Sequence, residues 1–448
     1  MRGFLASSIG VTCAAALALP LTLPASAAPA SASAPAPAVR STSGARTAST
    51  AAAPDLPGST QSLPLTPRTR DRTLGAAPEQ GLTRADVHRF SLVGVTWSDP
   101  DTELRGQVQV RTRAAGTGTW SGWQDIDTHN EDHGADPGTA ERDSGHVHGS
   151  TAPLWVGDSD GVDVRVRANT AAKRTVENIG ESASGLPTGL HLELVDPGAA
   201  QAPPAGAPAT TNRNRTATPR LAATELPALS RQATERELVA LGAKAQPYIG
   251  PRPRIVTRHG WGADEKLREK GFVYTKKVKA VFVHHTATGN NYRCSQAPSV
   301  IRGIYRYHVK SSGWRDIGYN FLVDKCGTIY EGRAGGVAKA VMGAHTLGFN
   351  TDSMGIAVLG TFGSAKPSSA AVTAIAKLTA WKLGLYGVNP RGKTYLKSGG
   401  GNLYRKGKNV RLNVISGHRD GFATECPGRQ LYGKLGSARS TSARYQGR

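Results

Sequence analysis

The chain has 448 residues and carries 55 Lys and Arg against 33 Asp and Glu, a formal net charge of +22 at pH 7. This excess of positive charge favours an anionic partner. No nucleic-acid-binding motif accompanies the charge, which argues against DNA or RNA, and no stretch beyond the N-terminal residues is long and apolar enough to cross a membrane.

The first residues have the pattern of a secretory signal peptide. An apolar stretch at residues 4–23 is followed by a small-x-small cleavage signal at residues 25–27. We predict that residues 1–27 are removed and that the protein is secreted, where a cell wall that bears anionic polymers is the better partner for the charge. A retained membrane anchor is less favoured because Pro20 interrupts the apolar stretch.

Composition divides the rest of the chain. Residues 28–82 are rich in Ala, Pro, Ser and Thr and have few large apolar side chains to form a core, which predicts a disordered segment. Residues 83–197 contain alternating runs at 91–97, 106–111, 161–167 and 191–195, separated by turn residues. This pattern predicts a small all-β, sandwich-like accessory domain.

Two features of this β domain allow two interpretations each. The polar run at residues 129–133, with Asp136, His146 and His148, is either a metal site or a solvated loop. Its spacing matches no specific ligand pattern, which favours the solvated loop. Four tryptophans either fill the core or stack on sugar rings: Trp97, Trp120, Trp123 and Trp155.

Residues 198–251 form a second Ala/Pro-rich linker. Within it Thr234 and Glu237 have the spacing of a capping box, which predicts a short helix capped at Thr234. The C-terminal domain is expected at residues 252–436 and a flexible tail at residues 437–448. Seven basic residues in this domain predict a solvated loop that also contacts the wall: Arg391, Lys393, Lys397, Arg405, Lys406, Lys408 and Arg411.

The C-terminal domain is predicted to be a mixed α/β unit. Apolar stripes of helical period predict helices at residues 298–310 and 368–386. A central sheet with helices on its faces would bring the ends of its first and last strands together. The predicted strands cover residues 278–284, 319–323, 328–331, 355–360 and 412–416.

His284, His418 and Cys426 form a candidate metal site. His284 ends the first of these strands, His418 follows the last, and Cys426 lies eight residues further on (426 − 418). Two imidazoles and a thiolate suit Zn²⁺, and three protein ligands leave the fourth tetrahedral position for water, the pattern of catalytic zinc. The alternative is two core histidines and a buried free thiol.

The cysteine count supports this assignment. Cys13 leaves with the signal peptide, so three of the four cysteines remain in a secreted chain. The simplest account pairs Cys294 with Cys326 in a disulfide and keeps Cys426 for zinc. A free, buried Cys426 is the less favoured alternative.

Five sequence words follow one another in the C-terminal domain: VFVHHTA at 281–287, GWRDIGYNF at 313–321, IYEGR at 329–333, GAHT at 343–346 and GHRD at 417–420. In that order they closely resemble the peptidoglycan recognition protein family, whose catalytic members are zinc N-acetylmuramoyl-L-alanine amidases of the phage T7 lysozyme type. The resemblance spans about residues 252–432 and implies a secreted bacterial member with Zn²⁺ at the three candidate ligands.

The resemblance implies hydrolysis of the amide between N-acetylmuramic acid and L-alanine in peptidoglycan. Tyr319 matches the family's catalytic tyrosine and would orient the attacking water or assist proton transfer, with a core tyrosine as the alternative. Thr424 stands where phage members carry lysine and animal amidases carry threonine, and it would donate a hydrogen bond to the oxyanion. His285 and His308 are expected to be structural.

Trp314, Arg333, His345 and Asn350 are the expected contacts with the stem peptide. Animal members that prefer diaminopimelate stems usually carry Gly-Trp near the Glu-Gly-Arg word, whereas this chain has Ala334-Gly335-Gly336. The family's stem-peptide rule therefore does not apply here.

Three functions compete on these residues. A zinc amidase is favoured because Cys426, both histidines and Tyr319 are all present, whereas non-catalytic peptidoglycan receptors of the same fold usually lose the cysteine. A zinc peptidase ranks last because no His-Glu-x-x-His helix occurs. A sugar-cleaving lysozyme would need paired carboxylates, to which no sequence feature points.

Overall fold

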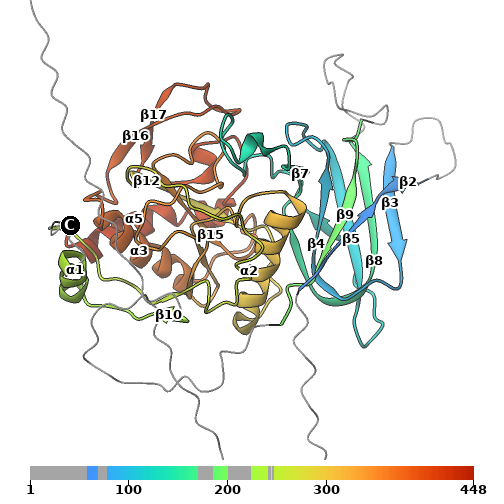
Figure 1. Cartoon of the computed structure of the whole chain (residues 1–448), viewed down its shortest axis with the longest axis horizontal. Coiled ribbons are helices and arrows are strands. Elements are labelled where there is room, and N and C mark those ends of the chain that lie inside the picture. The colour runs from blue at the N-terminus through green and yellow to red at the C-terminus, as the bar shows by residue number, and fades with distance from the viewer. Residues whose placement is uncertain (1–57, 69–77, 170–184, 200–222, 241–243, 245–246) are drawn as a thin grey trace, which may run out of the picture. The chain divides into compact units, whose positions relative to one another are not determined.

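The computed structural model describes residues 58–68, 78–169, 185–199, 223–240, 244 and 247–448 (Figure 1). The predicted signal peptide at residues 1–27 lies outside the described residues. Across the described part of the chain, no helix combines the length and the apolarity needed to span a membrane.

The first domain is an antiparallel β-sandwich built around one long strand, β8 (Leu154–Ala168). β8 pairs in its first half with β4 (Phe90–Trp97) and in its second half with β3 (Glu79–Arg84) and β5 (Gly106–Ala114), so it belongs to both layers. Its valines and those of β4 and β5 fill the space between the layers. The other strands are β1 (Thr60–Pro64), β2 (Thr66–Pro67), β6 (Gln124–Ile126), β7 (Gly149–Ser150) and β9 (His191–Val195).

The predicted strands of this domain are confirmed as β4, β5, β8 and β9, but the predicted disorder of residues 28–82 is wrong in part. β1 pairs with β9 along its whole length, and Leu65 is buried in the sandwich core. A short strand of modest apolarity is stable here because β9 offers an edge to pair with, which composition alone does not reveal. Residues 28–57 lie outside the described residues.

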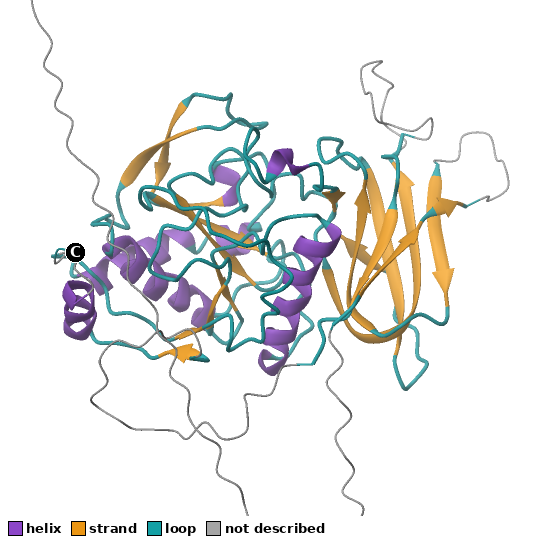
Figure 2. Cartoon of the chain, in the orientation of Figure 1, coloured by secondary structure: helices purple, strands orange, loops and turns teal. Residues whose placement is uncertain are grey.

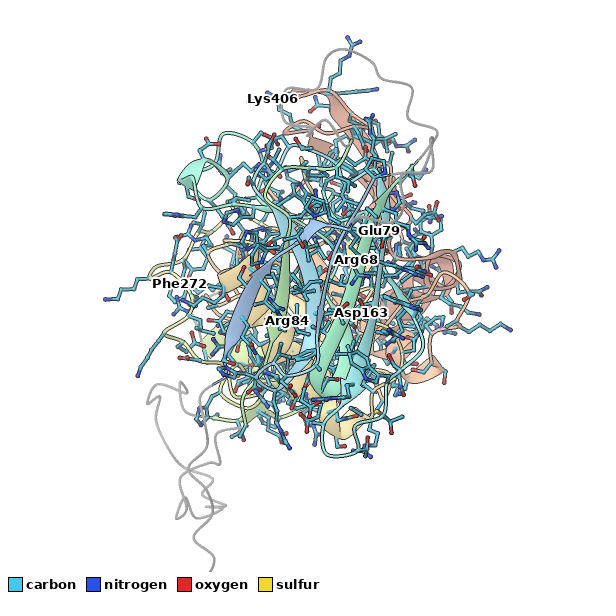
Figure 3. All side chains as sticks on the ribbon, turned by 90° about the vertical axis from the view of Figure 1, so that its right-hand side faces the viewer. Arg68, Glu79, Arg84, Asp163, Phe272 and Lys406 are labelled. Atoms are coloured by element: carbon cyan, nitrogen blue, oxygen red, sulfur yellow. A yellow bond between two sulfur atoms is a disulfide. The ribbon has the colours of Figure 1, made fainter. Side chains whose placement is uncertain are left out.

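The four tryptophans divide between core and surface. Trp97 and Trp155 are buried, whereas Trp120 is exposed and the Trp123 ring lies under the Arg165 guanidinium at 4.0 Å. The outer face that carries Trp123 is lined with ion pairs, since buried Asp163 bonds Arg68 at 2.6 Å and Arg111 at 2.9 Å. Figure 3 shows Arg68, Glu79 and Asp163 on this face.

The second domain is built on a mixed seven-stranded sheet in the order β10-β11-β14-β13-β15-β12-β18. β12, β13 and β15 run parallel, β18 runs parallel to β12, and β14 returns antiparallel to β13. Figure 2 shows the strands of this domain in orange among its purple helices. The first four predicted strands are therefore present as β12, β13, β14 and β15, each displaced by up to two residues at its ends. The strands are β10 (Glu225–Leu226), β11 (Ile255–Val256), β12 (Ala280–His285), β13 (Phe321–Val323), β14 (Ile329–Glu331), β15 (Ser353–Val358) and β18 (Ile415–Gly417).

Helices cover both faces of this sheet. α3 (Ser369–Gly384), capped by the Ser368 hydroxyl, packs with α5 (Leu435–Gln446) against Val281 and Val283. α2 (Ala297–Arg306), continued by one π-helical turn to Ser311, packs on the opposite face. These helices confirm the two predicted from apolar stripes. α4 (Arg429–Tyr432) is a single turn before α5.

The predicted flexible tail at residues 437–448 is wrong, because most of it belongs to α5. Leu435, Ala438 and Ala443 are buried, and Gln446 donates a hydrogen bond from Nε2 to the Ala380 carbonyl at 2.9 Å. Small residues form the buried stripe, so its hydrophobic signal is weak in the sequence.

The helix predicted to be capped at Thr234 begins earlier. α1 (Arg231–Ala240) is capped by Ser230, whose hydroxyl accepts from the Ala233 amide at 3.2 Å. Thr234 lies inside the helix, and its hydroxyl donates back to the Ser230 carbonyl at 2.9 Å. The capping-box interpretation is therefore wrong.

The strand predicted at residues 412–416 is two strands. β17 (Asn409–Asn413) pairs with β16 (Lys393–Lys397) as a separate ribbon, while β18 joins the central sheet. All seven basic residues predicted to lie on a solvated loop are exposed on this ribbon and its connections. Figure 3 shows Lys406 at its projecting end.

The cysteines follow the prediction. Cys294 precedes α2 and Cys326 lies in the turn between β13 and β14, and a disulfide joins them with their Cα atoms 6.2 Å apart. Cys426 is a free, buried thiol.

The β domain packs directly on α2. Leu92, Trp155 and Val195 belong to the same apolar cluster as Val300 and Ile304 of the helix. The Tyr307 hydroxyl reaches into the β domain and donates to the Thr151 carbonyl at 3.1 Å. A Cβ atom at Gly94 would lie 2.3 Å from that hydroxyl, so glycine is required for the approach.

Candidate metal centre

Strand register brings His284 and His418 together. Val283 of β12 pairs with Gly417 of β18 in a parallel ladder, so the residues that follow them leave adjacent strands at the same edge. Alternation along β12 turns His284 to the face opposite Val283, which packs on α3. A short 3₁₀ turn after His418 then returns the chain, and the Arg419 amide donates to the Cys426 carbonyl at 3.1 Å.

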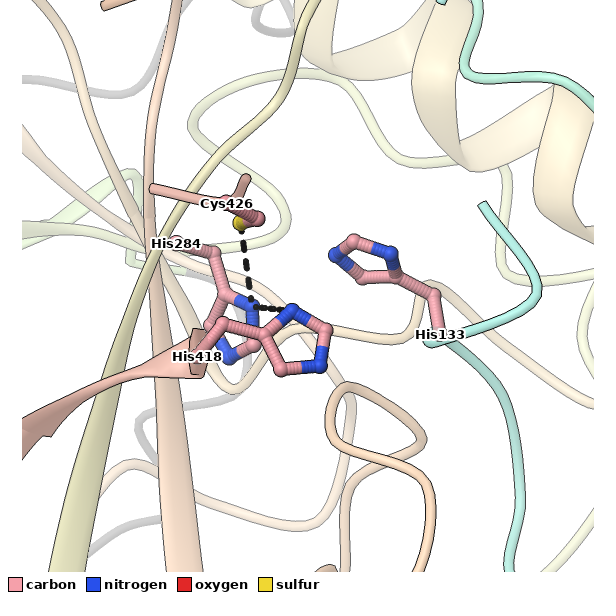
Figure 4. A group of neighbouring side chains, drawn as sticks. All are labelled: His133, His284, His418 and Cys426. Atoms are coloured by element: carbon pink, nitrogen blue, oxygen red, sulfur yellow. Dashed lines mark hydrogen bonds between the residues drawn. The ribbon is translucent and has the colours of Figure 1, made fainter. Parts of the chain in front are cut away.

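The three predicted ligands converge on one point (Figure 4). His284 Nδ1 lies 3.1 Å from His418 Nδ1 and 3.8 Å from Cys426 Sγ. In a tetrahedral zinc site, bond lengths of about 2.0–2.3 Å separate neighbouring ligand atoms by roughly 3.3–3.6 Å. The spacing of these buried donors is therefore close to that of a zinc site.

A fourth donor faces the same point, and it comes from the β domain. One ligand atom each of His133, His284, His418 and Cys426 lies within 4.8 Å of the others, and all four residues are buried. Nδ1 of His133 bonds Asp132 Oδ1 at 2.6 Å, while its Nε2 is buried without a hydrogen-bond partner. An unpaired buried nitrogen that faces two imidazoles and a thiol is the donor arrangement that a metal ion would satisfy.

Oxygen atoms behind the imidazoles orient them. His284 Nε2 lies 3.3 Å from the Thr346 hydroxyl, and His418 Nε2 lies 3.1 Å from the Asp132 carbonyl. When each Nε2–H donates to its oxygen, Nδ1 of each ring keeps its lone pair toward the cluster.

Burial sets the protonation of these groups. It lowers the pKa of His284 well below its ordinary value and that of His418 to about 3, so both rings are neutral at pH 7. Burial also raises the pKa of the Cys426 thiol. Only a cation at the cluster would make the thiolate favourable, and two lone pairs 3.1 Å apart repel each other without one. The donor set therefore fits zinc.

Tyr319 and Thr424 lie beside the cluster. The Tyr319 ring centre is 5.5 Å from that of His284 and 5.8 Å from that of His133, and burial raises the pKa of its hydroxyl. The Thr424 hydroxyl accepts from the Cys426 amide at 3.1 Å and also interacts with the Asp132 carboxylate. Both residues, with Cys426, line one small cavity.

The four residues expected to contact the stem peptide, hereafter the expected groove, are all buried: Trp314, Arg333, His345 and Asn350. The segment between β6 and β7 (residues 127–148), hereafter the β6–β7 segment, covers two of them directly. Its Glu141 forms a bidentate ion pair with Arg333 at 2.8 and 2.9 Å, and its Asp136 accepts from Asn350 Nδ2 at 2.6 Å.

His345 and Asn350 also support the metal centre from behind. Asn350 Oδ1 accepts from the His345 amide at 2.8 Å and the Thr346 amide at 3.2 Å, which holds the turn that carries Thr346. His345 is fully buried with its ring centre 5.2 Å from that of His284. His285 and His308 each accept a backbone amide, as their structural interpretation predicts.

Comparisons with known proteins match both domains. Residues 274–429 match the family described as N-acetylmuramoyl-L-alanine amidase, and residues 46–188 match the family described as Rv3811 N-terminal galactose-binding domain-like. Peptidoglycan-recognition protein SC2 of Drosophila simulans is 30% identical over 200 residues, which cover 44% of this chain and 92% of that protein.

The chain belongs to the peptidoglycan recognition protein family. Peptidoglycan-recognition protein SC1a of Drosophila melanogaster is 33% identical over 192 residues, 42% of this chain and 87% of that protein. The solved structure of Drosophila PGRP-LB is 26% identical and covers 41% of this chain and 92% of that chain, with a TM-score of 0.33. Membership supports peptidoglycan binding or amidase activity, and the His/Cys cluster is compatible with zinc.

His133 is the residue of the centre that the sequence offered only as part of the less favoured metal-site alternative. It lies outside the residues matched to the amidase family and 151 positions before His284 (284 − 133). The polar run that contains it was interpreted as a solvated loop, which is wrong because Asn130, Asp132 and Asp136 are buried with it. One signal in the sequence could have indicated the metal centre: the run is dense in His and Asp, and a solvated loop does not need so many potential metal ligands.

Proposed function

We propose that the protein is a zinc-dependent N-acetylmuramoyl-L-alanine amidase, which cleaves the amide between N-acetylmuramic acid and L-alanine in peptidoglycan. The observation that carries the proposal is the complete donor set, His284, His418 and Cys426, preformed beside Tyr319 in a chain of the peptidoglycan recognition protein family. A receptor of the same fold has no need of a buried thiol at this position.

The chain's own residues supply orientation and proton handling. Zinc, when bound, polarises the scissile carbonyl and makes a water molecule nucleophilic at neutral pH. Tyr319 remains protonated, since burial raises the pKa of its hydroxyl, and would orient the attacking water. The Thr424 hydroxyl, which lines the same small cavity as Cys426, would donate to the oxyanion that develops on the attacked carbonyl.

We place this activity outside the cell, at a wall with anionic polymers. The disulfide between Cys294 and Cys326 supports an oxidising compartment. The exposed basic residues of the β16–β17 ribbon support attraction to an anionic polymer. Arg333 and the neighbouring Trp314, His345 and Asn350 would contact the stem peptide once the β6–β7 segment leaves them.

A non-catalytic peptidoglycan receptor is the second candidate. It is favoured by His133, because a fourth protein donor beside the cluster is typical of a closed, structural metal site. The thiol and Tyr319 favour the enzyme.

Mass spectrometry of digested peptidoglycan tests the proposal. Purified peptidoglycan is incubated with zinc and with the wild-type chain, His133→Ala or Cys426→Ser. We expect free stem peptides that begin at L-alanine from His133→Ala at least, and none from Cys426→Ser. No cleavage by either wild type or His133→Ala, with binding retained, would assign the protein as a receptor instead.

A further inference from the structure

The β6–β7 segment lies where a substrate of the proposed amidase would have to lie. A catalytic zinc site needs an open fourth position for water or substrate. Here the unpaired Nε2 of His133 faces the three predicted ligands, and Figure 4 shows its ring turned toward them from the β domain's side. A fourth protein nitrogen at this position would close the site.

The segment is anchored in the groove by its carboxylates and its backbone. The ion pair of Glu141 with Arg333 is almost completely buried, with 2% and 4% of the respective side chains exposed. Asp136 Oδ1 accepts from the Asn350 side chain and from the Gly348 amide at 2.8 Å. The Asp132 carbonyl accepts from the Leu347 amide at 2.9 Å and from His418.

The side chains that anchor the segment are carboxylates, a group that a stem peptide would also present. Peptidoglycan stems carry free carboxylates, and the segment presents Glu141 and Asp136 to a guanidinium and an amide of the groove. A buried bidentate ion pair forms only when its geometry is well matched. The segment therefore occupies the groove as a competitor, and the apolar contact of β4 with α2 holds it nearby.

Resting on the proposed amidase function, we propose that the β6–β7 segment is an autoinhibitory plug: it fills the peptidoglycan groove through Glu141 and Asp136 and caps the metal centre through His133. The chain as folded is then latent. Activation requires the segment to leave the groove while the β domain stays attached. The apparent affinity for substrate is the intrinsic affinity multiplied by the fraction of molecules in which the segment is open.

Two variants weaken the plug at different points, and one is a matched control. His133→Ala removes the capping imidazole, and Glu141→Gln removes the charge that holds Arg333 while keeping the side chain's shape. His146→Ala is the same type of change at an exposed residue of the same segment. Binding of a muramyl tripeptide, in diaminopimelate and lysine forms, is measured by calorimetry on the metal-free full chain, and digestion is measured on the zinc-loaded chain.

We expect metal-free Glu141→Gln to bind the tripeptide at least about tenfold more tightly than wild type or His146→Ala. We expect zinc-loaded His133→Ala to digest peptidoglycan faster than wild type by a similar factor. Equal binding and equal digestion by all four proteins would overturn the plug and leave the amidase standing. Tighter binding by Glu141→Gln without digestion by any protein would support the plug and overturn the amidase.

Discussion

Glu141→Gln should loosen the β6–β7 segment by an amount that the buried ion pair determines. Burial lowers the pKa of Arg333, but the nearby carboxylates, Glu141 before Asp316, raise it, and the net shift is upward, so the buried guanidinium keeps its charge. Removing one partner of such a pair typically costs about 3–5 kcal/mol, because the other charge is left buried and unpaired. At about 1.4 kcal/mol per factor of ten, this loss corresponds to roughly a 100-fold or greater increase in opening.

The loss has a structural ceiling. Arg333 regains water as soon as the segment opens, so in the variant the open state is not destabilised. The free energy of global unfolding can therefore fall by no more than the free energy that local opening of the segment costs in wild type. Hydrogen exchange separates the two. The amides of His148, Leu347 and Gly348 are bonded across the contact, so their exchange should accelerate about 100-fold or to the limit of the open state.

Glu103→Gln is the matched control, because the pair of Glu103 with Arg105 is exposed and worth about 0–1 kcal/mol. The amides within β12 should exchange at the wild-type rate in both variants. If Glu141→Gln leaves the His148, Leu347 and Gly348 amides as protected as in wild type, the ion pair does not hold the segment. The reasoning from burial would then be refuted.

Three further outcomes are expected. Zinc at about 1,000 times its dissociation constant should raise the free energy of unfolding of wild type by about 4 kcal/mol. Thermal melts should show that Cys426→Ser loses most of this gain, and equal gains for both proteins would contradict the ligand set. Burial lowers the pKa of Lys382 to about 7, although Glu331 raises it, so between pH 7 and 10 the unfolded chain binds more protons than the folded chain. The free energy of unfolding should therefore rise with pH in that range, by up to about 1.4 kcal/mol per pH unit, and urea titrations of Lys382→Met should lack this rise. Truncation after Lys434 should lower the free energy of unfolding by at least about 3 kcal/mol, because it uncovers the α3 surface that Leu435 and Ala438 bury. Removal of residues 447–448 should lower it much less, and equal melting temperatures for the two truncated chains would restore the flexible-tail interpretation.

The core of the candidate site was predictable because its residues lie at strand ends in a sheet. Alternating apolar runs identified β12 and the chain before His418, and parallel pairing then required their ends to meet. Cys426 followed from its ligand chemistry and from the odd number of cysteines. The exact strand boundaries were not predictable, since the break between β17 and β18 falls at Val414, an apolar residue that continues the alternating pattern.

Features that depend on contacts between distant segments were missed. His133 approaches the cluster only because the β domain packs on α2, and no periodicity in its own run records that packing. α5 is held by Ala, Ser and Gln side chains against α3, a surface too weakly apolar to predict. β1 depends on pairing with β9, more than a hundred residues away along the chain.

X-ray absorption at the zinc edge of the zinc-loaded full chain tests the central claim most directly. A latent amidase centre predicts three nitrogens and one sulfur around the ion in wild type, from the two ligand histidines, His133 and Cys426. His133→Ala should lower the number of coordinated imidazoles, counted from the scattering of their outer ring atoms, from three to two while the sulfur remains. A wild-type spectrum without sulfur, or a spectrum unchanged in His133→Ala, would contradict the account.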